Sequence, residues 1–332
     1  MHENKDGSKI QLSIVILCYN MQRELPKTLK SLSADMQANM DEIPYEVIIV
    51  DNGSTLPYEL DPIPGPSRVQ FLKYDQPTPS PIPALNWAAS KAQGDILCIF
   101  IDGARLASPG LLATAMSIMG INNRTVVGTY SFHLGAKPQN ISIRKGYSKL
   151  QEDKLLESIL WPTNGYELFN IASLDPSSGD GILSIPAETN ALFLRRSLWQ
   201  DLGGYNEKFS GPGGGLANHD IWNRICSDER NKVTLLLGEG TFHQYHGGVS
   251  TNSIDDNWSK YVAEYQESTG IPYKMPKNVP YYYGQVDWRV RPFLAGELSR
   301  RFIERSFRAK LKSTAKRFPL LQNIYNFVRA RL

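Results

Sequence analysis

Short apolar runs alternate along the chain with segments whose leucines and alanines recur at helical spacing. Apolar, β-branched runs at 11–18, 45–50 and 95–101 predict buried strands. Helical spacing at 22–38 and 83–93 predicts helices between those strands. Alternation of this kind builds a mainly parallel sheet with helices on both faces. The pattern therefore predicts an α/β fold.

The connection from Pro57 to Pro83 contains eight prolines, which exclude a long helix and predict an extended surface excursion around a strand at 68–73. Later in the chain, a glycine-rich loop at 211–215 precedes a helix that is expected to begin near Asp220. The remaining predicted elements are helices at 108–119, 148–160 and 196–202 and strands at 125–132, 189–194 and 233–237.

Positive charge is concentrated at the C-terminal end. The 332 residues carry a net charge of +3, which does not indicate a nucleic-acid partner, yet residues 297–332 hold ten Lys or Arg against two Glu. Apolar Phe302, Ile303, Phe307 and Leu311 recur among these cations at helical spacing. This pattern predicts a basic amphipathic helix that lies on an anionic membrane surface, packs on the rest of the protein, or forms a homodimer interface.

The chain starts with a polar segment that lacks the apolar core of a signal peptide, and no 18 apolar residues run together. Cys18 and Cys98 lie in predicted strands and Cys226 in a predicted helix, so the three cysteines are expected to be reduced core residues. We therefore expect a cytoplasmic protein, which is peripheral at the inner face of the membrane if the basic tail binds lipid rather than packing on the protein.

Polar residues follow three of the predicted strands, at Tyr19-Asn20, at 51–54 (DNGS) and at Asp102-Gly103. Ligands of open α/β sheets bind at the carboxyl ends of strands, although the same residue types also form ordinary turns and helix caps. The first strand-to-helix turn, at 18–23 (CYNMQR), lacks the glycines of a dinucleotide-binding or phosphate-binding loop. Dehydrogenase and P-loop functions are therefore excluded.

Five blocks of sequence carry a family resemblance. The blocks are SIVILCYN at 13–20, LPKTLKSL at 25–32, YEVIIVDNGST at 45–55, ALNWAASKAQGDILCIFIDG at 84–103 and NALFLRRSLWQDLGGYNEKF at 190–209. Together they resemble the family 2 glycosyltransferases, inverting enzymes of the GT-A type fold, over about residues 11–250. The resemblance implies transfer of a sugar from a nucleoside-diphosphate sugar to a hydroxyl acceptor.

In this family the first two strand ends hold the base and ribose of the donor. The usual Asp-x-Asp motif reads Asp102-Gly103-Ala104-Arg105 here, so its second carboxylate is missing. Mn²⁺ or Mg²⁺ remains the implied cofactor, because these ions also accept water and donor phosphates as ligands. Alternatively, Arg105 contacts the diphosphate itself, or it is a solvated residue at the start of a helix. The implied donor-binding residues are Tyr19, Asn20, Asp51, Asn52, Ser54, Asn86, Asp102, Gly103 and Arg105.

Two histidines follow the predicted strand at 233–237, in a glycine-flanked segment at 238–248 that is expected to be a loop. Related enzymes often supply a metal-ligating histidine from this position, and a neutral imidazole binds Mn²⁺-like ions. The resemblance therefore implies Asp102 and His243 as metal ligands, with His246 as the alternative. A structural role for either histidine remains open.

Inverting transfer needs a carboxylate that accepts the proton of the attacking hydroxyl. The resemblance assigns this role to Asp220, whose usual Glu neighbour is replaced by His219; the alternative is that Asp220 only caps its helix. Glu188, Asn190 and His219 are expected to contact the acceptor.

The expected organisation is a disordered 1–10, a glycosyltransferase domain at 11–255, an irregular connection at 256–296 and basic helices at 297–332. Within the domain, 11–133 forms the donor half and 134–255 the acceptor half. The expected acceptor is a glycan or lipid-linked glycan of bacterial polysaccharide or glycolipid synthesis. Two alternatives are a catalytically silent relative that binds nucleotide-sugar or glycan, and a nucleotidyltransferase, whose glycine-rich loop with Arg and Lys the chain lacks.

Overall fold

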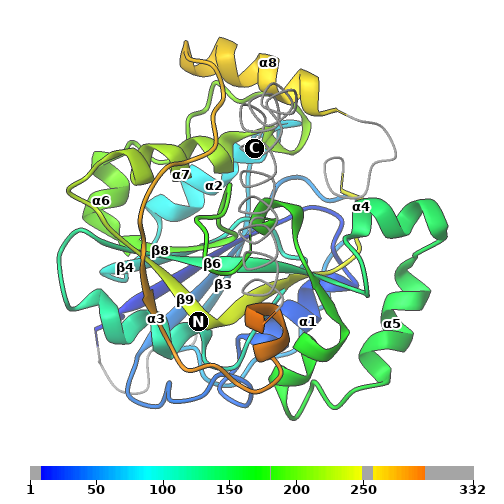
Figure 1. Ribbon diagram of the computed structural model, residues 1–332. Coiled ribbons are helices and arrows are strands. Elements are labelled where there is room, and N and C mark those ends of the chain that lie inside the picture. The colour runs from blue at the N-terminus through cyan, green and yellow to red at the C-terminus, as the bar shows by residue number, and fades with distance from the viewer. Residues whose placement is uncertain (1–8, 180, 249–256, 296–332) are drawn as a thin grey trace, which may run out of the picture.

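A single mixed sheet forms the centre of the protein in the computed structural model, which describes residues 9–179, 181–248 and 257–295 (Figure 1). Eight strands follow the order β10-β9-β6-β8-β4-β1-β2-β3, while β5 pairs with β9 and β7 with β6. The strands are β1 (Leu12–Cys18), β2 (Tyr45–Asp51), β3 (Arg68–Lys73), β4 (Ile96–Phe100), β5 (Arg105–Ala107), β6 (Thr125–Leu134), β7 (Ala172–Leu174), β8 (Ala191–Arg195), β9 (Lys232–His243) and β10 (Tyr281–Tyr283).

The half of the sheet that contains β3, β2, β1 and β4 is entirely parallel. Strand β8 then runs antiparallel between β4 and β6, and β6, β9 and β10 are again parallel to one another. The α-helices are α1 (Glu24–Ser31), α2 (Ile82–Ser90), α3 (Leu111–Met119), α4 (Gln139–Ser142), α5 (Lys149–Glu157), α6 (Arg196–Asp201), α7 (Ala217–Ser227) and α8 (Trp258–Thr269). The predicted mostly parallel α/β sheet is confirmed.

Helices cover both faces of the sheet, and each face has its own apolar core (Figure 1). Alternate side chains of β1 point to opposite faces, as the period of a strand requires. Val15 and Leu17 pack in the core under α2, α6 and α7. Ile14 and Ile16 pack in the core under α1 and α3. Burial on both faces explains why the parallel strands read as continuous apolar runs.

The helix predicted at 22–38 is shorter than expected, because α1 ends at Ser31 and turns follow it. The segment at 238–248, expected to be a loop, differs more from the prediction, because its residues up to His243 belong to strand β9. Gly238 has a φ of +86° and lies where the pairing of β6 with β9 shifts register. This irregularity lets the strand pass between β5 and β6 although its glycines are typical of a loop.

The segment at 256–296 is more regular than expected. It contains α8, and Tyr265 of α8 packs against Phe209 with ring centroids 5.8 Å apart. Strand β10 adds to the sheet beside β9, so the sheet extends past the predicted domain end at residue 255. Most of the predicted disordered N-terminus and the predicted basic helices at 297–332 lie outside the described residues.

Candidate active site

Three adjacent parallel strands bring the polar residues that follow them to one edge of the sheet. Cys18 at the end of β1 pairs with Asp51 at the end of β2. On the other side of β1, Ile16 pairs with Phe100 at the end of β4. The segments after Cys18, Asp51 and Phe100 therefore leave the same edge, which is where ligands bind in open α/β sheets.

Asn20, Asp51 and Ser54, here called the donor cluster, are joined directly by hydrogen bonds. Both the backbone N–H and the hydroxyl of Ser54 donate to Asp51 Oδ1, at 3.0 and 2.5 Å. The Asn20 N–H donates to Ser54 Oγ at 2.9 Å, and Asn20 Oδ1 accepts from the Thr55 N–H at 2.9 Å. Asn20 adopts a φ of +53°, a conformation that Asn tolerates better than most residues. The two predicted loops thus form one unit.

The other predicted donor residues differ in their surroundings. Tyr19 is half exposed at 50%, next to the donor cluster. Asn52 is buried and its amide donates to the Thr78 carbonyl at 2.9 Å. Gly103 is buried, and its carbonyl accepts from the Thr28 hydroxyl at 2.7 Å. Asn86 is engaged elsewhere: its amide donates to the Tyr205 carbonyl and accepts from the Tyr205 N–H. Asn86 therefore braces α2 against the chain near 205.

Asp102 is held in place by its own turn. Its Oδ1 accepts from the Ala104 N–H and its Oδ2 from Arg105 Nε, both at 2.9 Å. Arg105 opens strand β5, is only 5% exposed, and donates from its other end to Ser131 Oγ at 2.8 Å. Neither sequence-based hypothesis for Arg105 describes this arrangement. Its guanidinium is committed to orienting Asp102 inside the protein.

The two candidate histidines occupy different environments. His243 is 1% exposed, lies between β5 and β6 in the sheet, and its Nδ1 is 2.8 Å from Gln139 Oε1. His246 lies three residues further, partly buried, with its ring centroid 5.1 Å from that of His243. Burial lowers the pKa of His246, while the negative charge of Asp102 acts in the opposite direction. Of the two histidines, His246 is the one whose pKa the charge of Asp102 affects most.

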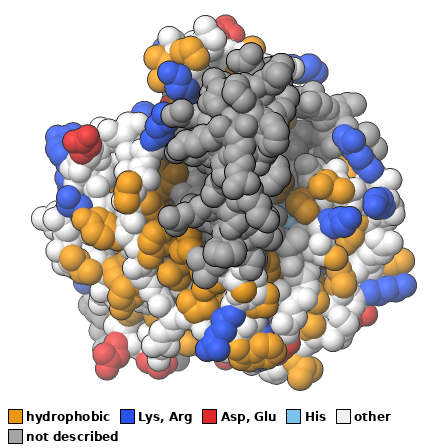
Figure 2. Space-filling view, viewed as in Figure 1, with side chains coloured by type: hydrophobic (Ala, Val, Ile, Leu, Met, Phe, Trp, Pro, Cys, Tyr) orange, Lys and Arg blue, Asp and Glu red, His pale blue; other side chains and the backbone are white. Residues whose placement is uncertain are grey.

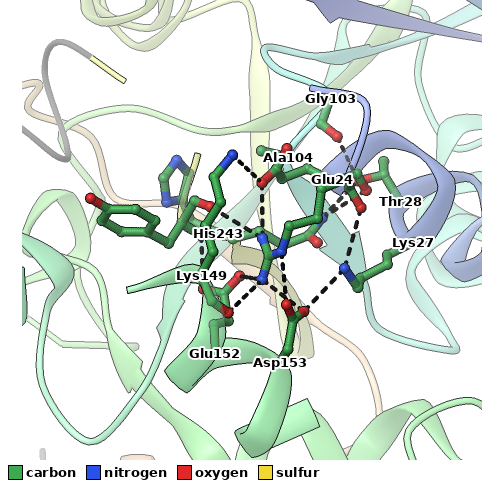
Figure 3. A network of polar contacts seen from close by, with 12 residues as sticks. Glu24, Lys27, Thr28, Gly103, Ala104, Lys149, Glu152, Asp153 and His243 are labelled. Atoms are coloured by element: carbon green, nitrogen blue, oxygen red, sulfur yellow. Dashed lines mark hydrogen bonds and ion pairs between the residues drawn. The ribbon is translucent and has the colours of Figure 1, made fainter. Parts of the chain in front are cut away.

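A network around Arg23, not predicted from the sequence, holds the segment near His246 in position (Figure 3). Arg23 forms ion pairs with Glu24 at 2.8 Å, Glu152 at 3.1 Å and Asp153 at 2.8 Å. It also donates to the Tyr245 carbonyl at 3.2 Å. The side chains of Glu24 and Glu152 are fully buried, which charged groups tolerate only when paired. The network ties α1, α5 and residue 245 together.

Glu188, Asn190, Asn218 and His219, here called the acceptor cluster, meet at the start of α7. The Asn218 amide donates to Glu188 Oε2 at 2.6 Å and lies 3.5 Å from Asn190 Oδ1. His219 Nε2 is 3.7 Å from the same Glu188 oxygen, and its Nδ1 is 3.0 Å from the Tyr273 hydroxyl. The Glu188 side chain is 20% exposed. The structure thus brings the three predicted acceptor residues together through Asn218, which the sequence analysis missed.

Asp220 has a different environment from its neighbours in α7. The helix begins at Ala217, so Asp220 does not cap it. Its Oδ2 accepts from Arg224 Nε at 2.9 Å, and Arg224 also donates to the carbonyls of Leu202 and Gly204. Burial raises the pKa of Asp220, and the Arg224 ion pair opposes this effect. These contacts fasten α7 to the loop after α6.

Two connections join the acceptor cluster to the donor edge. Ala191 at the start of β8 pairs with Phe100 at the end of β4, so Asn190 and Ile101 are neighbours at the same edge. The segment after residue 77 forms the second connection, because Thr78 accepts from Asn52 and the Pro79 carbonyl accepts from the Gly213 N–H at 3.1 Å. The glycine-rich loop before α7 is thereby attached to the loop after β2.

A mostly parallel sheet flanked by helices, with polar loops at the carboxyl ends of its strands, has the arrangement of a GT-A type fold. The family model described as "Glycosyl transferase family 2" matches residues 13–201, which is more than half of the chain. The chain therefore belongs to glycosyl transferase family 2. A search of the curated proteins found no match.

Solved structures with a similar arrangement share little sequence with this chain. TarS of S. aureus in complex with UDP-GlcNAc is 14% identical, with a TM-score of 0.46 over 78% of this chain and 67% of that one. GalNAc-T7 with UDP, GalNAc and Mn²⁺ is 14% identical, with a TM-score of 0.47 over 81% of this chain and 53% of that one. A further TarS structure is 13% identical, with a TM-score of 0.45 over 71% of this chain, and the match spans only 37% of its length. The family assignment rests on the family match.

Within 9–179, 181–248 and 257–295, no three His, Cys, Asp or Glu side chains are grouped as metal ligands. Over the same ranges, every helix is too short or too polar to cross a bilayer.

Proposed function

We propose that this chain is an inverting transferase that moves a sugar from a nucleoside-diphosphate sugar to a hydroxyl of a glycan or lipid-linked acceptor. The observation that carries the proposal is the pairing of β4 with β8, Phe100 opposite Ala191. This pairing brings the chain after β4, which carries Asp102, next to Asn190 of the acceptor cluster, and β1 and β2 with the donor cluster follow β4 in the sheet. Inverting transfer needs these two components next to each other, since the acceptor attacks from the face opposite the leaving nucleotide.

In the proposed complex the donor cluster binds the nucleoside. Asp51 Oδ1 is already occupied by Ser54, which leaves Oδ2 to accept from a base imide or a ribose hydroxyl. Tyr19, which precedes Asn20 in the chain and is half exposed, would offer its ring for stacking on the base. Asp102, held by Ala104 and Arg105, would contact the ribose or the diphosphate.

A divalent cation fits this site only if the donor supplies most of the ligands. Asp102 and His246 are the two side chains suited to it, a carboxylate and an imidazole whose pKa burial lowers, so that it is neutral at pH 7. Mn²⁺ and Mg²⁺ accept phosphate oxygens and water as the remaining ligands. When bound, the ion would neutralise charge on the departing diphosphate. His243 is committed to Gln139 and is not included.

For the general base we favour Glu188 over Asp220. Glu188 is the partly exposed carboxylate of the acceptor cluster, and it is oriented by Asn218 at 2.6 Å. Asp220 is 4% exposed, and its Oδ2 is already occupied by the Arg224 ion pair. In the proposed step, the acceptor oxygen forms the new bond to the sugar, its proton passes to Glu188, and the nucleoside diphosphate leaves with the electrons of the broken bond.

The direct test is a thermal-shift panel of nucleoside diphosphates and their sugars with full-length protein, with and without Mn²⁺, followed by a transfer assay with the donor that binds. A ligand that binds only the folded state raises the midpoint of unfolding. We expect one nucleotide class to stabilise the wild type and not Asp51→Ala. Stabilisation without transfer to any glycan would favour the silent relative, and no stabilisation by any nucleotide would contradict the proposal.

A further inference from the structure

A second concave site lies away from the donor and acceptor clusters. A pocket of about 590 Å³ opens between the turn after β6 and the outer face of α5. Lys137, Lys145 and Lys154 line it together with the Tyr147 ring, and we call it the lysine pocket. Lys and Arg side chains gather on this side of the molecule, where Figure 1 places α4 and α5 (Figure 2).

The two faces of α5 carry opposite kinds of group. Gln151, Lys154, Leu155 and Ser158 follow one another at helical spacing and line the pocket. Glu152 and Asp153 lie on the other face, where they pair with Arg23. Glu152 and Asp153 are therefore directed toward Arg23, and Lys154 is left on the pocket side, three residues before the exposed Glu157.

The positive charge of the pocket is not balanced by its surroundings. Among the described residues, none of the three lysines forms an ion pair, and the pocket lining contains no Asp or Glu. Lys137, Lys145 and Lys154 are exposed, and Ser142 uses its hydroxyl to donate to the Lys137 carbonyl. Three lysines that line one concavity attract an anion more strongly than a single surface lysine does.

We propose that the lysine pocket binds a phosphorylated saccharide. Three cations match a group with two negative charges better than a single carboxylate, and lysine binds phosphate as a compact point charge. The Tyr147 ring, Leu155 and Ala136 add apolar surface against which a sugar ring can lie. The pocket therefore suits a ligand that combines an anionic group with a sugar ring. A bare ion lacks the ring, and an uncharged glycan lacks the anionic group.

The pocket is connected to the active-site network through Tyr147. Its hydroxyl donates to Glu152 Oε2 at 3.2 Å, and its ring meets the Tyr245 ring edge-on at 6.1 Å. Glu152 in turn accepts from the Tyr245 N–H at 2.7 Å. A bound ligand would therefore lie one side chain away from the segment that carries His246. Binding itself does not depend on transfer activity or on the identity of the donor.

Lysine footprinting of the full-length protein tests the site residue by residue. The protein is acetylated with and without glucose 1-phosphate at constant ionic strength, and modification is measured by mass spectrometry. We expect threefold or greater protection of Lys137, Lys145 and Lys154, with the exposed lysines Lys208 and Lys260 unchanged. Equal protection of all five, or protection of none of the pocket lysines, would overturn the proposal. The location of the protected lysines separates this site from any binding at the donor cluster.

Two further ligands in the same experiment, inorganic phosphate and phosphatidylglycerol vesicles, identify the source of the anion. Inorganic phosphate should protect less than glucose 1-phosphate, and phosphatidylglycerol vesicles should not protect better than either. Stronger protection by vesicles would assign the pocket to a lipid surface and overturn the saccharide proposal. The double variant Lys145→Gln/Lys154→Gln should weaken protection of Lys137 by glucose 1-phosphate about tenfold, whereas Lys208→Gln should leave it unchanged. Unchanged protection in the double variant would also contradict the proposal.

Discussion

The donor cluster and the acceptor cluster are built on different supports. The donor cluster joins two loops that each follow a buried parallel strand, and Asp51 and Ser54 bond within a single turn. The acceptor cluster joins the chain before β8 to the start of α7, and its contacts span about 30 residues, as between Glu188 and Asn218. Both clusters depend on tertiary contacts, since Asn20 and Ser54 are also 34 residues apart. They differ in their supports, because the donor cluster lies at the ends of two parallel strands, whereas the acceptor cluster lies between a loop and a helix. The clusters should respond differently to substitution.

The largest expected effect lies in the acceptor cluster. Glu188→Gln keeps the size of the side chain and an oxygen that can accept from Asn218, but removes the proposed proton acceptor. We expect kcat to fall by about 10²–10⁴ while the KM for donor stays within about twofold. The measurement is steady-state transfer with the donor and acceptor concentrations varied separately. The matched control Glu229→Gln, at an exposed position, should keep wild-type kcat; an equal loss there would remove the reason for singling out Glu188.

A second prediction concerns a carboxylate outside both clusters. Glu239 of β9 is 3% exposed and accepts from Ser108, Tyr166 and the Gly110 N–H. Burial raises its pKa from 4.5 to about 7, and these hydrogen bonds act in the opposite direction. Since the folded state binds this proton more tightly, the resulting stability is complete below pH 4.5 and is lost as pH rises through 7.

The free energy of unfolding of the wild type should fall between pH 5 and pH 8 as Glu239 loses its proton. Glu239→Gln should reduce that fall by roughly 3 kcal/mol at most. Denaturant unfolding at both pH values measures it, and Glu229→Gln should retain the wild-type slope. A wild-type slope in Glu239→Gln would contradict the assignment. Because Glu239 belongs to neither cluster, this substitution also shows how much of any pH dependence of activity comes from stability alone.

The donor cluster should lose binding rather than turnover. Asp51→Ala removes the acceptor of two Ser54 hydrogen bonds and the proposed contact to the nucleoside. We expect the dissociation constant of the nucleoside diphosphate to rise by about 10- to 100-fold, as measured by calorimetry. Asn86→Ala, a loss of amide contacts away from the cluster, should lower stability and leave that constant nearly unchanged. If Asp51→Ala and Asn86→Ala weakened nucleoside diphosphate binding equally, the donor cluster would not differ from the residues that support it.

The smallest effect separates the two histidines. His246→Ala should weaken Mn²⁺ binding in the presence of the nucleoside diphosphate by several-fold, because donor oxygens supply the other ligands. His243→Ala should instead lower the midpoint of thermal unfolding, since His243 is buried and bonded to Gln139. Titration of Mn²⁺ followed by electron paramagnetic resonance measures the first effect. Unchanged Mn²⁺ affinity in His246→Ala would exclude it as a ligand.

The parallel half of the sheet could be predicted from the sequence because its strands are apolar on both faces and stop at polar turns. The predicted runs at 45–50 and 95–101 correspond to β2 and β4 within one residue at each end. The donor cluster followed from them, since parallel strands deliver their ends to one edge. Strand β9 was harder to predict, because Gly238 and Gly240 in its middle are typical of a loop, and its pairing with β5 and β6 is a long-range effect.

The acceptor side shows why the rest of the site could not be predicted. Successive residues of a helix point about 100° apart, so Asn218 and His219 lie near Glu188 while Asp220 pairs with Arg224. A sequence match that is correct to within two residues cannot tell which of them faces the acceptor. The ion pair of Asp220 with Arg224, and the buried contact of Arg105 with Ser131, depend on packing that only the three-dimensional structure reveals.

The most direct test compares two carboxylates, that of Asp220 in the first turn of α7 and that of Glu188 beside the start of this helix. Transfer by Glu188→Gln and by Asp220→Asn is measured in single turnover, with both rates corrected for the folded fraction. We predict that Asp220→Asn keeps at least about a tenth of the wild-type rate and that Glu188→Gln keeps less than about a hundredth. The reverse order would contradict the account and return the role of base to Asp220.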